Sequence, residues 1–213
     1  MKVISTILIL LLGCLMVNCV EEEKIEIDGD YFPLQEDSGW EYLREFFSTA
    51  DDSAFLWSDT LRTFIKGDTI FEGLSYKKVV DQYGNLIKVL RKQEGKYYGR
   101  NHELYLGFTT EYLFLDEGAS LNSSWRHYKN DSTSVTEYKV TAVNSIRTFN
   151  NVEYHSVMEL EVNYYYLEGE EFVLHYSTLH YYAKGIGEIY TFYPYPASLT
   201  YSDLNISLLK YNP

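Results

Sequence analysis

The side chains best suited to metal or acid–base chemistry in this sequence are histidines, of which there are five. His175 and His180 form the closest pair, and they lie in a run, "HYSTLHYYA", with the composition of a β-strand. An odd spacing puts two side chains on opposite faces of a regular strand, whereas a bulge between them would bring them to one face. A metal ion needs further ligands at fixed spacing, and none is evident here. We therefore predict no metal site and no cofactor.

A catalytic nucleophile is equally hard to find. The sequence has no Gly-x-Ser-x-Gly elbow, and neither of its cysteines lies beyond residue 19. The paired acids Glu159/Glu161 and Glu170/Glu171 have the spacing of solvated charges on a strand face or in a turn. A hydrolase built from Asp, Glu and Tyr alone remains an alternative, but the pattern favours a protein that is not an enzyme.

The two cysteines, Cys14 and Cys19, lie in or beside an apolar run over residues 3–17 that follows a positively charged start. This arrangement resembles a bacterial lipoprotein signal, in which the first residue of the mature chain is a lipid-bearing cysteine. "LLGC" has small-residue spacing before Cys14 but leaves a short signal. "MVNC" places an unusual Asn18 at the cut but gives a better length. We favour Cys19 as the lipidated residue, with Cys14 as the alternative.

Three glutamates, Glu21 to Glu23, follow directly. They are similar to the surface-export signature of Bacteroidota-type lipoproteins, or they form a simple solvated tether. The first interpretation implies a lipid-anchored protein of the outer membrane that faces the medium. We accordingly divide the chain into a signal peptide (1–18), an acidic tether (19–30) and one domain (31–213).

Composition restricts what this domain can bind. The formal net charge is −13, which repels phosphate backbones, so we expect no nucleic-acid partner. The 22 tyrosines, 11 phenylalanines and 3 tryptophans suit strands with one buried and one wet face. No disulfide can form in the domain, because it contains no cysteine.

The elements that must position any site are predicted to be strands. "MELEVNYYY" (158–166) alternates strictly, which indicates an antiparallel sheet with one wet face. In the run after 171 the apolar phase slips, which predicts a bulge near Ser177. Glu159, Glu161 and Asn163 are expected to face water. The opposite, buried face is expected to hold Met158, Leu160, Val162, Tyr164 and Tyr166.

An internal repeat is also suggested. "FEGLSYKKV" (71–79) and "FNNVEYHSV" (149–157) share aromatic and apolar residues at identical spacing, with Gly73 matching Asn151. Gly and Asn adopt positive φ most easily, so the repeat predicts one turn used twice. The chain would then have two similar halves, 31–105 and 112–193, unless the match arises by chance among aromatic-rich strands.

Three further pieces carry a resemblance to a family. They are "YFPL" followed by Gly-Trp-x-Tyr, "GDTIFEGLSYKKV", and "YYAKGIGEIY" near the end. Together they resemble uncharacterised outer-membrane lipoproteins of the Bacteroidota type. The resemblance implies an all-β fold with a strongly curved antiparallel meander, a half-barrel or open barrel-like sheet, and no known activity. In the last piece, Gly185 and Gly187 should let one strand end and the next begin in a new direction.

Four Asp-Ser/Thr pairs resemble the O-glycosylation sites of exported proteins from the same bacterial group. The acceptors would be Ser53, Thr60, Thr69 and Ser132. Ordinary turn chemistry is the alternative, because Asp beside Ser or Thr favours turns.

We predict a lipid-anchored, non-catalytic binding module whose concave, Tyr-lined sheet face holds a glycan, a peptide or an apolar, lipid-like ligand. The alternative is a structural or interaction component of a surface assembly. A deep aromatic groove would favour binding, and a filled core would favour the alternative.

Overall fold

The computed structural model describes residues 29–48, 54–103, 107–129, 133–194 and 203–213. All thirteen regular elements in these ranges are strands, which confirms the predicted all-β class. Within the same ranges no helix is long and apolar enough to cross a membrane. Cys14, Cys19, Ser53 and Ser132 lie outside the described residues.

The strands are β1 (Gly39–Phe47), β2 (Phe55–Phe71), β3 (Leu74–Asp81), β4 (Leu86–Gln93), β5 (Lys96–Glu103), β6 (Gly107–Phe108), β7 (Tyr112–Asp116), β8 (Ser124–Tyr128), β9 (Ser134–Phe149), β10 (Val152–Glu168), β11 (Glu171–Ala183), β12 (Gly187–Tyr193) and β13 (Asp203–Asn212).

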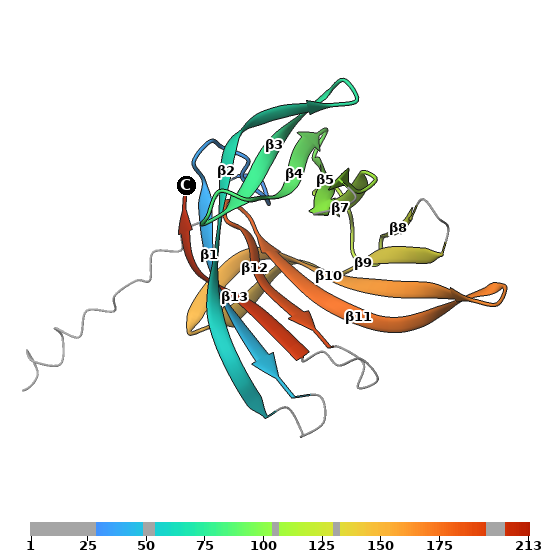
Figure 1. The fold of residues 1–213 in the computed structure, drawn as a ribbon. Helices are drawn as coiled ribbons and strands as arrows, with labels where there is room; N and C mark the ends of the chain where they lie inside the picture. Colours follow the sequence, from blue (N-terminus) through green and yellow to red (C-terminus); the bar gives the residue numbers. More distant parts are fainter. Residues whose placement is uncertain (1–28, 49–53, 104–106, 130–132, 195–202) are drawn as a thin grey trace, which may run out of the picture.

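These strands form one antiparallel sheet in the order β6-β5-β4-β3-β2-β1-β13-β12-β11-β10-β9-β8, with β7 also paired to β5. Two meanders, β1–β5 and β8–β13, are joined where β1 pairs with β13. The sheet curls into a nearly closed barrel (Figure 1). This confirms the predicted open barrel-like sheet. At the seam the indole N–H of Trp125 on β8 donates to the carbonyl of Leu113 on β7 at 2.8 Å.

The two segments of the suspected repeat both form hairpins with two-residue turns. Glu72 and Gly73 have φ of 52° and 80°, and Asn150 and Asn151 have φ of 51° and 62°. Positive φ at both central positions is the requirement of a type I′ turn, whose twist matches that of the flanking strands. Gly73 and Asn151 therefore occupy the same turn position, while the division of the whole chain into halves stays a prediction.

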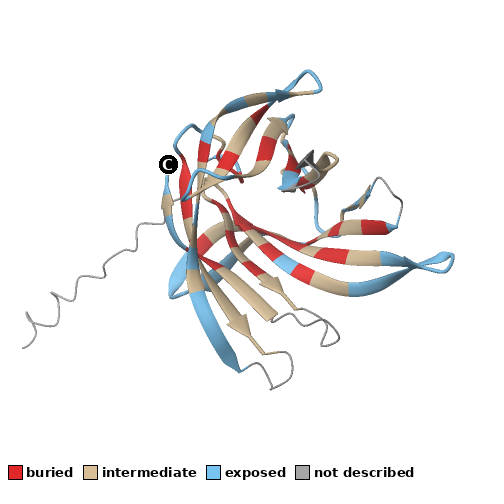
Figure 2. Cartoon of the chain, in the orientation of Figure 1, coloured by how far each residue is buried: buried red, intermediate tan, exposed pale blue. Residues whose placement is uncertain are grey.

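Buried residues lie along the middle of the strands, and the hairpin tips are exposed (Figure 2). Trp40 is 2% exposed and packs between Phe32 and Tyr211, with ring centroids 5.1 and 5.7 Å away. Its indole N–H donates to the carbonyl of Ile186 at 2.5 Å. Gly187 has φ of 108°, and a Cβ there would lie 3.0 Å from the indole nitrogen. Gly185 in the β11–β12 turn, with φ of 73°, and Gly187 at the start of β12 therefore serve the change of direction that the sequence predicted.

One expectation for β10 is wrong. Met158, Leu160 and Val162 are buried as predicted, but so are Glu159 and Asn163, at 8% and 7% exposure. Neighbouring strands cover this second face. The carboxylate of Glu159 accepts from the Ser145 hydroxyl at 2.7 Å and pairs with Arg147 at 2.7 Å, and Asn163 accepts from the Ser177 hydroxyl at 2.5 Å. In contrast, Tyr166 near the end of β10 is 37% exposed rather than buried.

The predicted bulge lies two residues earlier than expected. Tyr164 pairs with Tyr176, but Tyr165 pairs with Leu174, so His175 is the extra residue in the ladder. The phase slip in the sequence therefore marked a real irregularity but not its position.

Candidate functional site

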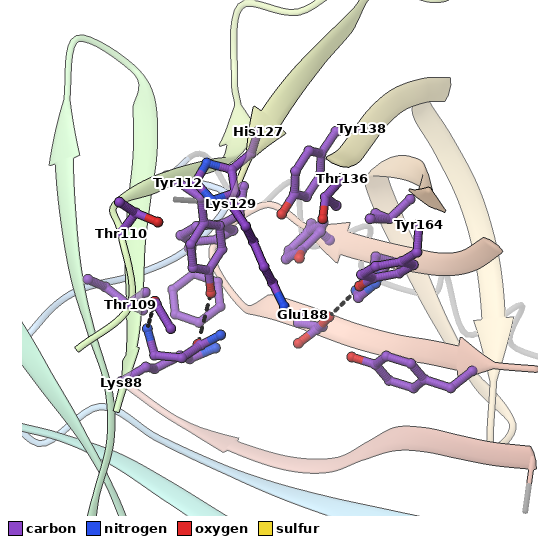
Figure 3. A pocket seen from close by; sticks show the side chains of 18 residues that line it. Lys88, Thr109, Thr110, Tyr112, His127, Lys129, Thr136, Tyr138, Tyr164 and Glu188 are labelled. Atoms are coloured by element: carbon purple, nitrogen blue, oxygen red, sulfur yellow. Dashed lines mark hydrogen bonds and ion pairs between the residues drawn. The ribbon is translucent and has the colours of Figure 1, made fainter. Parts of the chain in front are cut away.

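A cavity of about 640 Å³ lies inside the curve of the sheet (Figure 3). Strands from both meanders form its wall, together with Phe32 from the segment before β1. The lining residues are Phe32, Lys88, Leu90, Asn101, Thr109, Thr110, Tyr112, Phe114, His127, Lys129, Thr136, Tyr138, Val162, Tyr164, His180, Tyr182, Glu188 and Tyr193.

Tyrosine rings dominate the lining, and two of them stack on rings of the neighbouring strand. Tyr138 stacks on Trp125 at 5.6 Å with an interplanar angle of 6°, and Tyr164 stacks on Tyr176 at 4.5 Å and 18°. Burial raises the pKa of both Tyr112 and Tyr138 above the usual value for tyrosine. Their hydroxyls stay protonated at neutral pH, and that of Tyr112 donates to Oδ1 of Asn101 at 2.9 Å. The cavity therefore offers aromatic faces whose hydroxyls are neutral.

A buried polar network occupies one wall. Oε1 of Glu188 lies 2.8 Å from Nδ1 of His180 and accepts from the hydroxyl of Thr191 at 2.6 Å. Burial alone would raise the pKa of Glu188. The hydrogen bond and positive charge of His180, with the charge of Lys88, outweigh burial and lower that pKa to about 2. Glu188 is therefore an ionised acceptor at physiological pH.

The same wall contains a hydroxyl, an imidazole and a carboxylate in line. Thr178 Oγ1 lies 2.9 Å from Nε2 of His180, whose other nitrogen contacts Glu188. This order of groups is that of a catalytic triad. However, Thr178 is completely buried, so its hydroxyl cannot attack a ligand in the cavity. The chain of contacts fixes the His180 ring instead.

The two histidines singled out in the sequence do not come together. His180 faces the cavity, whereas His175 is in the exposed part of β11 and contacts Glu168 at 2.9 Å. Among the described residues, no group of three or more His, Cys, Asp or Glu side chains could hold a metal ion.

Cationic side chains complete the lining. Lys88 on β4 and Lys129 just after β8 both line the cavity, as does His127 (Figure 3). Burial and, next, the charge of Lys129 lower the pKa of His127, so this imidazole is neutral at neutral pH. None of the ion pairs between described residues includes Lys88 or Lys129.

Sequence reasoning anticipated a Tyr-lined concave face but none of the charged residues on it. Lys88 and Glu188 are far apart in the chain, and only the curl of the sheet brings both to one cavity. The alternation of residues 158–166 placed Tyr164 on the buried face of its strand, and the structure places it half-buried in the lining of the cavity.

The described candidates for O-glycosylation lie on β2 rather than in turns. Thr60 is exposed and Thr69 is half-buried. The preceding aspartates form ion pairs across the sheet, Asp59 with Arg44 at 2.5 Å and Asp68 with Lys77 at 2.8 Å. Modification of Thr60 and Thr69 stays a prediction.

Comparison with known proteins adds little. No protein-family model matches the chain, and no curated protein matches it at a significant level. A crystal structure described as that of a candidate lipoprotein from Parabacteroides distasonis superposes with a TM-score of 0.45 and 8% identity. The superposition covers 87% of this chain and 100% of that one. At this distance the match assigns no function.

Proposed function

We propose that this chain is a non-catalytic binding module that holds its ligand in the cavity inside the sheet. The observation that carries the proposal is the cavity of about 640 Å³ itself. This volume falls in the range of about 300–1,000 Å³ typical of ligand sites. A purely structural component has no need of such a space, because a sheet of this kind is stabilised by filling its interior.

The character of the lining supports the same proposal. The lining combines aromatic faces with hydroxyl, amide and charged groups, and cross-strand stacking holds Tyr138 and Tyr164 in place. A preformed site loses little side-chain freedom when a ligand binds, which favours affinity.

Thermal unfolding with panels of oligosaccharides, peptides and fatty acids tests this proposal. At least one class should raise the melting temperature of the parent protein by several degrees, as binding to the native state requires. Thr110→Trp places a large ring in the cavity and should abolish the shift. Thr60→Trp, on an exposed position of β2, is the matched control and should keep it. The proposal fails if no class stabilises the parent, or if Thr110→Trp responds like the parent.

We also infer that the domain is anchored by lipid at Cys19, with Cys14 as the alternative, on the outer membrane facing the medium. Acyl chains such as palmitate bind membranes through buried methylenes. The fold supports a tether ending near residue 30. The carbonyl of Asp30 accepts from the amide of Gly185 at 2.8 Å, and the side chain of Asp30 pairs with Lys92.

Cell fractionation tests the anchor. Cys19→Ala should move the protein from the membrane to the soluble fraction, and Cys14→Ala should not. Release by Cys14→Ala alone would reverse the choice of cysteine. A double variant that stays on the membrane would contradict lipidation itself. Protease added to intact cells should digest the domain if it faces the medium.

A further inference from the structure

The charge of the cavity is opposite to that of the protein. The chain as a whole carries a formal net charge of −13. The cavity nevertheless collects Lys88 and Lys129, with Glu188 as its one carboxylate. Two lysines of the first meander, β1–β5, are neutralised locally. Lys77 pairs with Asp68 at 2.8 Å, and Lys92 pairs with Glu117 at 2.8 Å. Two amines without such partners among the described residues, on a concave wall, create a local positive potential that attracts anions.

The single carboxylate offsets only one of the two amine charges, so the lining stays net positive. Among the described residues, both hydrogen bonds to the carboxylate of Glu188 engage Oε1, one with His180 and one from Thr191. The Oε2 atom therefore remains available to accept a hydrogen bond from a ligand hydroxyl. The wall thus offers an acceptor for neutral hydroxyls beside amines that suit a negative group.

The remaining lining distinguishes between ligand classes. A fatty acyl chain would cover the hydroxyls of Thr110 and Thr136 without giving them hydrogen bonds. Covering a polar group without giving it a hydrogen-bond partner weakens binding. A saccharide has hydroxyls for these groups and apolar C–H faces for the tyrosine rings. It can therefore satisfy the polar and the aromatic parts of the lining together.

We propose that the cavity recognises an acidic saccharide, that is, a sugar unit that carries a carboxylate or a sulfate. In this arrangement Lys88 and Lys129 bind the negative group, the tyrosine faces pack on the ring, and Glu188 accepts a hydroxyl. This assignment rests on the proposed function, because it names the ligand class of the same site.

Isothermal titration of the protein with matched disaccharides tests the assignment. The probes are glucuronate- and galacturonate-containing disaccharides, the same disaccharides with the carboxylate reduced to hydroxymethyl, and O-sulfated disaccharides. At least one acidic probe should bind ten-fold or more tightly than its neutral counterpart, and the difference should shrink as NaCl is raised. The carboxylate and sulfate arms show which anionic group is preferred.

Matched variants locate the effect. Lys88→Met and Lys129→Met remove charge while keeping side-chain length, and the double variant should lose the ten-fold preference but keep its affinity for the neutral probe. Lys210→Met, at an exposed position on β13, is the control and should behave like the parent.

Two results would overturn the assignment. One is equal affinity for acidic and neutral probes, and the other is an unchanged preference in the double variant. If peptides or fatty acids stabilise the protein while no saccharide binds, the acidic-saccharide assignment fails and the binding function stands. If no class of ligand stabilises it, both fail.

Discussion

The β2–β3 and β9–β10 hairpins have the same kind of turn but are held by opposite chemistry. At the first tip, the guanidinium of Arg100 lies 4.3 Å from the ring centroid of Phe71 and 2.6 Å from the carboxylate of Glu72. At the second tip, Phe149 stacks on Tyr190 at 4.3 Å and 6° and meets the edge of Tyr181 at 5.0 Å.

In these two hairpins, different residues determine the course of the backbone and the contacts of the tip. In both hairpins the pairing of the two strands shifts register part-way along. In the first hairpin the shift includes Gly67, which has φ of 69°. In the second the shifts include Asn144 and Ser156, each with φ of 51°. Residues with positive φ therefore set the course of the backbone in both. The side chains at each tip then decide whether the contact depends on charge or on stacking, and this difference can be measured.

Truncation of a buried residue away from the tip should lower the free energy of unfolding by a similar amount in the two hairpins. Ile65 on β2 is 0% exposed and Leu160 on β10 is 1% exposed. Truncation of either to alanine should lower the free energy of unfolding by about 2–5 kcal/mol. Glu161→Ala, on the opposite face of β10, should cost less than about 0.5 kcal/mol. Denaturant unfolding measures all three, and a loss for Leu160→Ala no larger than that for Glu161→Ala would contradict the assigned faces.

Acidic pH should destabilise the protein through protonation of Glu188 on β12, in the second meander. The pKa of its carboxyl lies at about 2 in the folded protein, below the ordinary value of 4.5. A depressed folded pKa stabilises the protein above the unfolded pKa, and this contribution is lost as the pH falls from about 4.5 toward 2. The contribution of this pKa difference to the free energy of unfolding is roughly 3 kcal/mol. Glu188→Gln should therefore flatten the dependence of unfolding free energy on pH in this window, and an unchanged slope would count against the assigned shift.

The tips themselves should differ in stability. Phe149 has two aromatic partners, so Phe149→Ala should cost about 2–3 kcal/mol from lost packing and stacking. Phe71 lies against the guanidinium of Arg100, and loss of that contact in Phe71→Ala should cost about 1 kcal/mol. Chemical denaturation gives both values. A larger loss for Phe71→Ala would show that the charged contact, and not the stacked one, holds its hairpin more firmly.

Salt should affect only the first tip. The side chain of Glu72 is 68% exposed, so its pair with Arg100 should contribute at most about 1 kcal/mol, as exposed pairs do. The cost of Glu72→Gln should largely disappear in 1 M NaCl, where screening acts over about 3 Å. The cost of Phe149→Ala should not fall in the same salt series. Equal salt dependence of the two variants would remove the distinction between the tips.

The features that the sequence predicted correctly are those that depend on neighbouring residues in the chain. Alternation and turn residues are local signals, and they correctly predicted the all-β class, the turn at Gly73 and Asn151, and the buried row from Met158 to Val162. Burial of Glu159 depends on Arg147 and Ser145 of the neighbouring strand, whose register no local pattern encodes. The cavity depends on strand partners still farther apart, which explains why composition predicted a Tyr-rich concave face but neither its individual tyrosines nor its lysines.

The pairing of β1 with β13 has a consequence for the order of folding. Gly39 pairs with Asn212, so one of the first strands synthesised finds this partner only among the last. Until β13 is available, one edge of β1 and one edge of β12 expose unpaired backbone groups, which are prone to pair with other chains. Such distant pairing also slows folding. Loss of β13 would therefore leave two separate meanders with open edges, and the nascent chain should need protection from aggregation until this strand is added.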